Sequence, residues 1–221
     1  MKQDLCALLR GNPYPGRGIV LGMTPDGKSS VAVYFIMGRS ANSRNRVFAE
    51  EPDGIRTQAA DPARMEDPSL IIYHPVRQMG RGLIVTNGDQ TDTILEFLKQ
   101  GLPMEQALRT REFEPDGPNW TPRISAILNA DGSFEMSILK HKNGRCLREF
   151  FCYEGCDENQ GYFISTYQGD GNPLPTFAGE PLEVTVPKPE EVWAALNGDN
   201  KVSLYTNVNG EVRLFNKNLG D

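Results

Sequence analysis

The chain has 221 residues, of which 38% are hydrophobic and 24% charged, a composition typical of a globular protein with an apolar core. Its formal net charge of −6 and its scattered basic residues argue against a nucleic-acid partner. No apolar stretch approaches the length of a membrane span, and the first residues lack the apolar core of a secretory signal, so we expect a cytoplasmic protein without membrane contact.

Residues that bind metals are sparse. The chain has only two histidines, His74 and His141, and its four cysteines are irregularly spaced without a C-x-x-C pair. Both observations argue against a zinc site. We therefore expect no metal and no cofactor, and we interpret His74, which precedes Pro75 at a strand end, as a partly exposed structural residue.

The first part of the chain predicts strands. Residues 17–23 and 30–37 are expected to form a β-hairpin, because two apolar runs flank the turn sequence TPDGKS. Residues 50–69 are rich in Pro, Asp and Ala and are expected to form an irregular loop. Short buried strands are expected at residues 70–73 and 82–87.

Two helices are expected next. The first lies within residues 88–101, where Thr93 and Glu96 have the spacing of a capping box and Gly101 marks the end. The second is expected at residues 104–113, after a proline that favours a helix start. Both would interrupt the run of strands.

The second half of the chain returns to strands. The predicted elements are, in order, a hairpin at 123–139 around Asp131-Gly132, strands at 146–153 and 161–168, a helix at 189–198, and a hairpin at 201–216 around Asn209-Gly210. Antiparallel hairpins with helices segregated between them indicate an α+β protein and not a doubly wound parallel sheet. We expect a single domain over residues 1–221, since no repeat or low-complexity linker divides the chain.

The common catalytic signatures are missing, but a run of arginines draws attention. The chain contains no P-loop, no G-x-G-x-x-G after a strand, no H-E-x-x-H and no G-x-S-x-G. Residues 38–46, GRSANSRNR, carry three arginines directly after a predicted strand. Guanidinium groups pair bidentately with phosphate or carboxylate oxygens, so this arginine loop is a candidate anion site. The alternative is a solvated loop without function.

Two further segments place polar residues at strand ends. In residues 86–92, TNGDQTD, a buried strand turns into a helix whose first N–H groups are free to hold an anion. Alternatively, Asn87 and Asp89 only build the turn and cap the helix. In residues 114–128 acidic residues lead to Arg123 at the mouth of a strand, where an arginine is costly to bury unless it is paired. The alternative is a plain helix-to-strand connection.

Five segments in order carry a resemblance to a known family: YPGRGIVLG, GRSANSRNR, IIYHPV, LIVTNGDQTD and NWTPRISAIL. The chain resembles the archaeal-type inosine monophosphate (IMP) cyclohydrolases over residues 13–140, best at N-G-x-x-T-D and T-P-R-I-x-A-I-L. It departs from them in a segment that precedes Tyr14 and in a longer arginine loop, and residues 146–177 carry no motif that can be placed.

The resemblance implies a fold and a reaction. The fold is a four-layer αββα sandwich of antiparallel sheets like that of the N-terminal-nucleophile hydrolases, without a processed nucleophile. The reaction closes the purine ring: 5-formamidoimidazole-4-carboxamide ribonucleotide loses water and becomes IMP in purine nucleotide biosynthesis. The partner is then a small purine-precursor ribonucleotide, bound through its phosphate by the arginine loop. We also expect a homo-oligomer.

The residue types suit this reaction. Both reacting groups belong to one molecule, so positioning, a donor on the formyl oxygen and an acid–base group can supply the acceleration without metal or redox cofactor. The expected phosphate ligands are Arg39 with Arg44 or Arg46. The expected catalytic residues are Tyr73, Asn87 and Arg123, which orient or polarise the base, and Asp116 or Glu114 as acid–base group. The remaining residues expected to bind substrate are Arg17, Ser40, Gly88, Asp89, Thr91, Asp92 and Thr121.

Two alternative functions stay open. An amide hydrolase of the N-terminal-nucleophile type would need a Cys, Ser or Thr exposed by cleavage before the first strand, and the segment NPYPGRG contains none. A non-catalytic relative would bind the nucleotide through the arginine loop without turning it over. Ring closure depends on geometry and not on one diagnostic residue, so the sequence does not separate this alternative from the enzyme.

Overall fold

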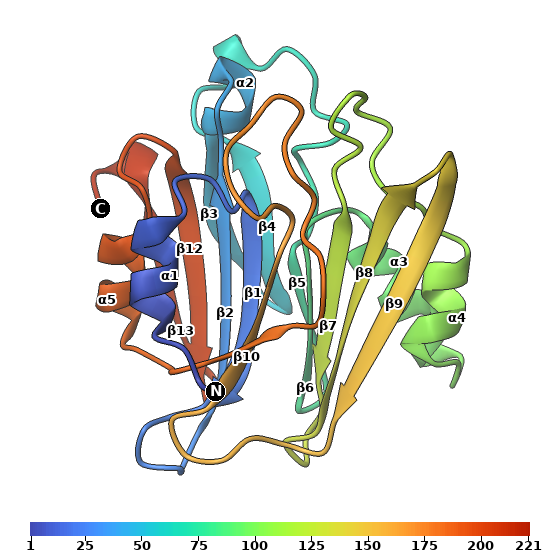
Figure 1. Ribbon diagram of the computed structural model, residues 1–221, viewed down its shortest axis with the longest axis vertical. Coiled ribbons are helices and arrows are strands. Elements are labelled where there is room, and N and C mark those ends of the chain that lie inside the picture. Colours follow the sequence, from blue (N-terminus) through green and yellow to red (C-terminus); the bar gives the residue numbers. More distant parts are fainter.

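The computed structural model describes residues 1–221 and shows an α+β protein with two antiparallel sheets (Figure 1). The six-stranded sheet has the order β11 (Leu182–Val184), β10 (Gly161–Ser165), β1 (Arg17–Met23), β2 (Ser30–Met37), β12 (Lys201–Val208) and β13 (Glu211–Asn216). The seven-stranded sheet has the order β3 (Arg46–Glu51), β4 (Gly54–Ala59), β5 (Val76–Met79), β6 (Gly82–Thr86), β7 (Arg123–Leu128), β8 (Phe134–Lys142) and β9 (Arg145–Tyr153).

Helices cover the outer faces of the two sheets (Figure 1). The helices are α1 (Leu5–Gly11), α2 (Ala41–Arg44), α3 (Gln90–Lys99), α4 (Met104–Arg109) and α5 (Pro189–Ala195), with short 3-10 turns η1 (Pro62–Arg64) and η2 (Lys217–Leu219). Helices α1 and α5 share a hydrophobic cluster with the six-stranded sheet, and α3 and α4 share another with the seven-stranded sheet. None of these helices is long and apolar enough to cross a membrane.

Alternation along β1 and β2 builds two cores at once. Side chains of successive strand residues point to opposite faces, so Ile19 and Leu21 enter the core between the sheets while Val20 enters the core under α1 and α5. Both faces of the hairpin are therefore apolar. Gly18 lies opposite Phe35, and a Cβ at Gly18 would lie 2.3 Å from the Phe35 ring, which explains a glycine inside this strand.

Several predicted elements are confirmed. The hairpin β1–β2, the strand β6, the helices α3, α4 and α5, the strands β9 and β10 and the hairpins β7–β8 and β12–β13 occur where the sequence predicts them, with ends that shift by a few residues. The α+β class and the antiparallel pairing are confirmed with them. His74 is half-buried as expected, and its ring contacts the carboxylates of Glu51 and Asp92.

Three predictions in the first part of the chain are wrong. Residues 50–69 are not all loop, because β3 and β4 form a hairpin that turns at Pro52-Asp53. No strand lies at residues 70–73; the strand begins after Pro75, as β5. Thr93 and Glu96 do not cap a helix start, because α3 already begins at Gln90 with Asp89 as N-cap. Helices α1 and α2 and the strand β11 are additional to the predicted elements.

Antiparallel pairing brings several strand ends to one end of the two sheets. The starts of β1, β3 and β7 lie there together with the ends of β2, β6 and β10. In Figure 1 this is the upper end, where α2 and the arginine loop lie. Polar residues that the sequence scatters over 150 positions therefore meet in space.

Candidate active site

A cavity of about 310 Å³ opens at this end of the sheets. Its lining residues are Tyr14, Arg17, Arg39, Ser40, Asn42, Ser43, Asp67, Leu70, Ile71, Glu114, Asp116, Asn119, Thr121, Tyr167 and Leu174. The volume lies at the lower end of the range found for sites of small molecules. Six predicted site residues thus share one cavity, although they come from three separate parts of the chain.

Glu114 is the most deeply buried acid of the cavity. It follows α4, and only 2% of its surface is exposed. Burial raises the pKa of its carboxyl group to about 7, although the charges of Arg17 and Arg123 lower it; the nearby Asp116 raises it further. A carboxyl group with such a pKa can give or take a proton near neutral pH.

Two arginines are buried beside the cavity without a carboxylate partner. Arg46, at the start of β3, donates from Nε to the carbonyl oxygen of Ser43 at 2.8 Å, while its Nη1 has no partner. The Nε of Arg17 is also buried and unpaired. Burial lowers the pKa of Arg46. For Arg17 burial also acts to lower the pKa, but Glu114 together with the neighbouring tyrosines outweighs it and raises the pKa. Buried donors without partners are costly, so an anionic or carbonyl group of a ligand would satisfy them.

The three arginines of the arginine loop lie in different surroundings. Arg39 lies at the cavity mouth, where Nη1 donates to Asp170 at 2.6 Å and the guanidinium lies over the ring of Tyr14. Arg46 is buried as described above. Arg44 lies outside the cavity and donates to the carbonyl oxygen of Gly38 and the side chain of Asn200. The structure therefore brings Arg39, but not Arg44, to the cavity.

Ser40 holds the arginine loop in shape. Its hydroxyl accepts a hydrogen bond from the backbone N–H of Ser43 at 3.1 Å, and the hydroxyl of Ser43 accepts one from the N–H of Ser40 at 3.0 Å. This reciprocal pair is a capping box at the start of α2. Ser40 lines the cavity from this position.

Tyr73 lies deep at the same end of the sheets. Its hydroxyl forms a hydrogen bond of 2.8 Å with that of Tyr34 on β2, and both tyrosines are buried. Burial raises the pKa of Tyr34 well above its ordinary value, so that this hydroxyl stays protonated. Tyr73 does not line the cavity, and its electrostatic effect on the buried Arg17 and Arg46 opposes that of burial on their pKa.

The turn from β6 into α3 uses its polar groups internally. The Asn87 side chain accepts from the backbone N–H of Ile124 at 2.8 Å and donates to the carbonyl oxygen of Pro122 at 2.8 Å. The hydroxyl of Thr91 donates to the carbonyl oxygen of Gly88 at 3.1 Å. These contacts tie β6, α3 and β7 together and match the interpretation of this segment as a structural turn.

The acids of this turn also have protein partners. Asp89 forms ion pairs with Arg111 and, at 2.8 Å, with Nη1 of Arg123. Asp92 contacts His74 and Arg77. Residues 87–92 do not line the cavity, and their link to it is Arg123, whose charge reaches Glu114.

Tyr167 is a cavity residue for which the sequence carried no motif. Its hydroxyl lies 2.5 Å from Oγ1 of Thr121, and this oxygen in turn contacts Oδ2 of Asp116. The backbone N–H of Thr121 donates to Oδ1 of Asp116 at 2.6 Å. Tyr167 follows β10 at the same end of the sheets. The sequence predicts a strand at 161–168, which includes Tyr167, so a search for polar residues after predicted strands would have missed it; the observed strand ends at Ser165.

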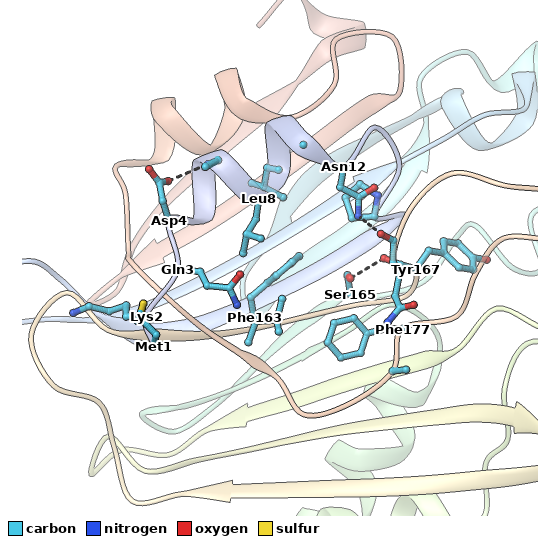
Figure 2. Close-up of a pocket in the computed structure, with 17 residues that line it drawn as sticks. Met1, Lys2, Gln3, Asp4, Leu8, Asn12, Phe163, Ser165, Tyr167 and Phe177 are labelled. Carbon is cyan, nitrogen blue, oxygen red and sulfur yellow. Dashed lines mark hydrogen bonds between the residues drawn. The ribbon is translucent and has the colours of Figure 1, made fainter.

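A larger hollow of about 1010 Å³ lies beside α1 and is shown in Figure 2. Apolar groups such as Leu8, Phe163 and Phe177 make up much of its wall, and it contains no cluster of buried ionisable groups. Tyr167 belongs to both hollows, but in Figure 2 its hydroxyl points away from the groove. The convergent charges lie in the smaller cavity, which is therefore the candidate active site.

The protein is of the α+β class, and its candidate site combines the buried Arg17 and the exposed Arg39 with an acid of raised pKa, a set of groups that suits a small anionic ligand. The family model described as IMP cyclohydrolase-like protein matches residues 14–212, and the chain belongs to this family. The chain is 31% identical to the IMP cyclohydrolase of Methanococcus aeolicus, over 70% of this chain and 74% of the relative.

Other similar proteins are also named IMP cyclohydrolase. The IMP cyclohydrolase of Methanococcus maripaludis strain S2 is 34% identical over 70% of this chain and 75% of the relative. That of Methanocaldococcus jannaschii is 27% identical over 77% of this chain and 82% of the relative. The family match also covers residues 146–177, where sequence inspection placed no motif.

Proposed function

We propose that this chain is an IMP cyclohydrolase, which closes the ring of 5-formamidoimidazole-4-carboxamide ribonucleotide to give IMP and water. The observation that carries this proposal is Glu114, a buried acid with a pKa of about 7, beside the unpaired donors of Arg17 and Arg46. Membership of the IMP cyclohydrolase-like family supports it. The alternative of an amide hydrolase finds no comparable support.

The proposed chemistry relies on positioning and proton transfer. The carboxamide nitrogen and the formyl carbon belong to one substrate, so a rigid cavity gains most of its effect by holding them together. Buried N–H donors polarise the formyl oxygen, and they act more strongly than in water because their surroundings have a low dielectric constant. In this proposal Arg17, which lines the cavity, is the main donor, the buried Tyr73 and Arg46 support it, and Glu114 supplies the proton.

The phosphate is proposed to bind at the mouth of the cavity. Arg39 and Ser40 lie there, whereas Arg44 points elsewhere. Arg46 is fully buried and donates to the carbonyl oxygen of Ser43, a residue that lines the cavity. Nη1 of Arg39 donates to Asp170, and a phosphate dianion would replace this carboxylate as the acceptor. Asn87 and residues 88–92 act indirectly in this proposal, by holding Arg123 beside Glu114.

We also propose the fold to be a four-layer αββα sandwich of the N-terminal-nucleophile-hydrolase type, formed by residues 1–221 as one domain. The helix pairs on the outer faces of the two sheets and the core between the sheets support this order of layers. A cytoplasmic location, a homo-oligomeric state and the absence of a nucleic-acid partner remain expectations. The expected location and the expected absence of a nucleic-acid partner rest on composition and charge.

The function is tested by incubating the pure protein with the formamido ribonucleotide and following the absorbance of the product. We expect IMP to form with the wild type and much more slowly with Glu114→Gln, which cannot give a proton. A wild type that binds the ribonucleotide without forming IMP would instead identify the non-catalytic relative.

The phosphate site is tested at Arg39. Arg39→Ala should weaken ribonucleotide binding about ten- to a hundred-fold by removing charge-assisted hydrogen bonds, and Arg39→Lys should recover only part of the loss. The dephosphorylated nucleoside is the control ligand. If Arg39→Ala weakens binding of nucleoside and nucleotide equally with the fold intact, Arg39 does not hold the phosphate.

A further inference from the structure

A chain of three side chains leads from the cavity wall to a carboxylate. The hydroxyls of Tyr167 and Thr121 are 2.5 Å apart and both residues are buried. Thr121 contacts Asp116 twice, through its hydroxyl and its backbone N–H. All three residues line the cavity, and Asp116 is partly exposed, so its end of the chain also reaches solvent.

The direction of the hydrogen bonds follows from what each group can do. An ionised carboxylate only accepts, so the Thr121 hydroxyl donates its single hydrogen to Asp116. The Thr121 oxygen then accepts, and the hydrogen of Tyr167 points toward it. The remaining lone pair of the Tyr167 oxygen is thereby left for a ligand. Burial raises the pKa of Tyr167 to about 12 despite the nearby Arg17, so this hydroxyl is protonated at neutral pH.

We propose that Tyr167 is a further catalytic residue, which takes the proton from the attacking carboxamide nitrogen and passes its own through Thr121 to Asp116. This inference rests on the proposed ring closure and deepens it by assigning two roles. Asp116 is the base, acting through Thr121 and Tyr167, and Glu114 is the acid. The two carboxyl groups differ in burial, which suits opposite roles.

The proton balance closes over two steps. In the first, the carboxamide nitrogen bonds to the formyl carbon, and its proton enters the chain at Tyr167 while Asp116 becomes protonated. Glu114 gives its proton to the formyl oxygen at the same time. In the second, the C–O bond breaks and the departing hydroxyl receives the proton of Asp116 through the same chain. The Glu114 carboxylate removes the proton of the former formamide nitrogen as its C=N bond forms, and water leaves.

The other buried pair of hydroxyls cannot serve in the same way. Tyr34 and Tyr73 are 2.8 Å apart, but both are phenols, and burial raises the pKa of Tyr34. The hydroxyl of Tyr34 or Tyr73 forms no hydrogen bond with a carboxylate, whereas that of Thr121 contacts Asp116. The chain that ends at Asp116 is therefore the one suited to take up a proton.

The test compares variants that keep volume but remove one hydroxyl. Tyr167→Phe and Thr121→Val should each lower kcat about a hundredfold or more, the range for loss of a general base, while KM and the affinity for IMP stay near wild type. The double variant should be no slower than either single variant, because both break one chain. Thr121→Ser keeps the hydroxyl and should recover most of the rate.

Tyr205→Phe is the matched control, since Tyr205 is also buried and its hydroxyl accepts one hydrogen bond, from Asn207, outside the cavity. It should leave kcat unchanged. An active wild type with an equally active Tyr167→Phe variant overturns the relay but not the ring closure. If the losses in kcat of the two single variants multiply in the double variant, the two residues act separately. If the variants change only KM, they act in binding. Either result overturns the relay. A wild type without turnover overturns both proposals.

Discussion

At the scale of single residues, burial and the neighbouring arginines shift the pKa of Glu114 in opposite directions. Burial raises the pKa of its carboxyl group to about 7 from an ordinary value of 4.5, against the effect of Arg17 and Arg123. The folded protein thus holds this proton more tightly than the unfolded chain does. The stability linked to this proton is fully present below pH 4.5 and is lost as the pH rises through 7.

We therefore expect a pH-dependent difference between the wild type and Glu114→Gln, whose amide does not titrate. Relative to the variant, the wild type should lose up to about 3 kcal/mol of its free energy of unfolding between acidic and alkaline pH. This energy corresponds to the difference between the pKa values of Glu114 in the unfolded and the folded protein. Urea unfolding at pH 4 to 8 measures this. A difference that stays constant over this range would mean that Glu114 is not a buried titrating acid.

At the scale of elements, the turn between β6 and α3 is tightly packed around a glycine. A Cβ at Gly88 would lie 2.4 Å from Nη1 of Arg123 and 2.6 Å from Oε1 of Gln90. These two groups also bond to each other at 2.7 Å. Because Gly88 has no side chain, Arg123 at the start of β7 can reach Gln90 at the start of α3. The charge of Arg123 in turn lowers the pKa of Glu114.

Gly88→Ala should push Arg123 out of place, at a cost of about 1–3 kcal/mol in stability for an overpacked site. A weaker positive charge beside Glu114 should also raise the pKa of this acid further. The fall of kcat at alkaline pH should then occur at a higher pH. Thermal unfolding and kcat against pH measure the two effects. Gly198→Ala is the control, because a Cβ there meets nothing within 4 Å. Equal behaviour of both variants would contradict the proposed packing.

At the scale of the whole molecule, α1 stands outside the region that the family model matches, residues 14–212. Its apolar residues nevertheless complete the core under the six-stranded sheet, where Leu5 and Leu9 are 1% and 2% exposed. Helix α1 also packs along α5. An element additional to the family match is thus part of the stabilising core.

Leu9→Ala should destabilise the protein by about 2–5 kcal/mol, the range for truncating a buried leucine, without changing kcat at temperatures where the variant is folded. Leu8→Ala on the same helix is the comparison, because Leu8 is only partly buried and should cost less. Denaturant titration and the ring-closure assay separate the two properties. If both variants are as stable as the wild type, α1 does not contribute to the core.

Local signals were sufficient to predict much of the fold. Asp131-Gly132 and Asn209-Gly210 occur at tight turns because such pairs adopt the backbone these turns need, and the flanking apolar runs form the strands. The hairpin β3–β4 also carries such a signal, Asp53-Gly54, within a segment whose Pro, Asp and Ala content instead predicted a loop. Helix α1 is a different case. A seven-residue helix has little stability alone, and α1 exists because the sheet and α5 pack against it.

The sequence by itself determined which residues are candidates, since arginines and acids at the ends of buried strands are costly without a purpose. It also determined the α+β class, because turn chemistry and apolar periodicity act over a few residues. Only the tertiary structure decided that Arg39 lines the cavity, that Arg46 is buried and that Arg44 forms its contacts outside the cavity. Only the structure, likewise, joined Tyr167 to Thr121. The physical reason is that antiparallel pairing sets which strand ends meet, and this pairing depends on contacts between distant residues.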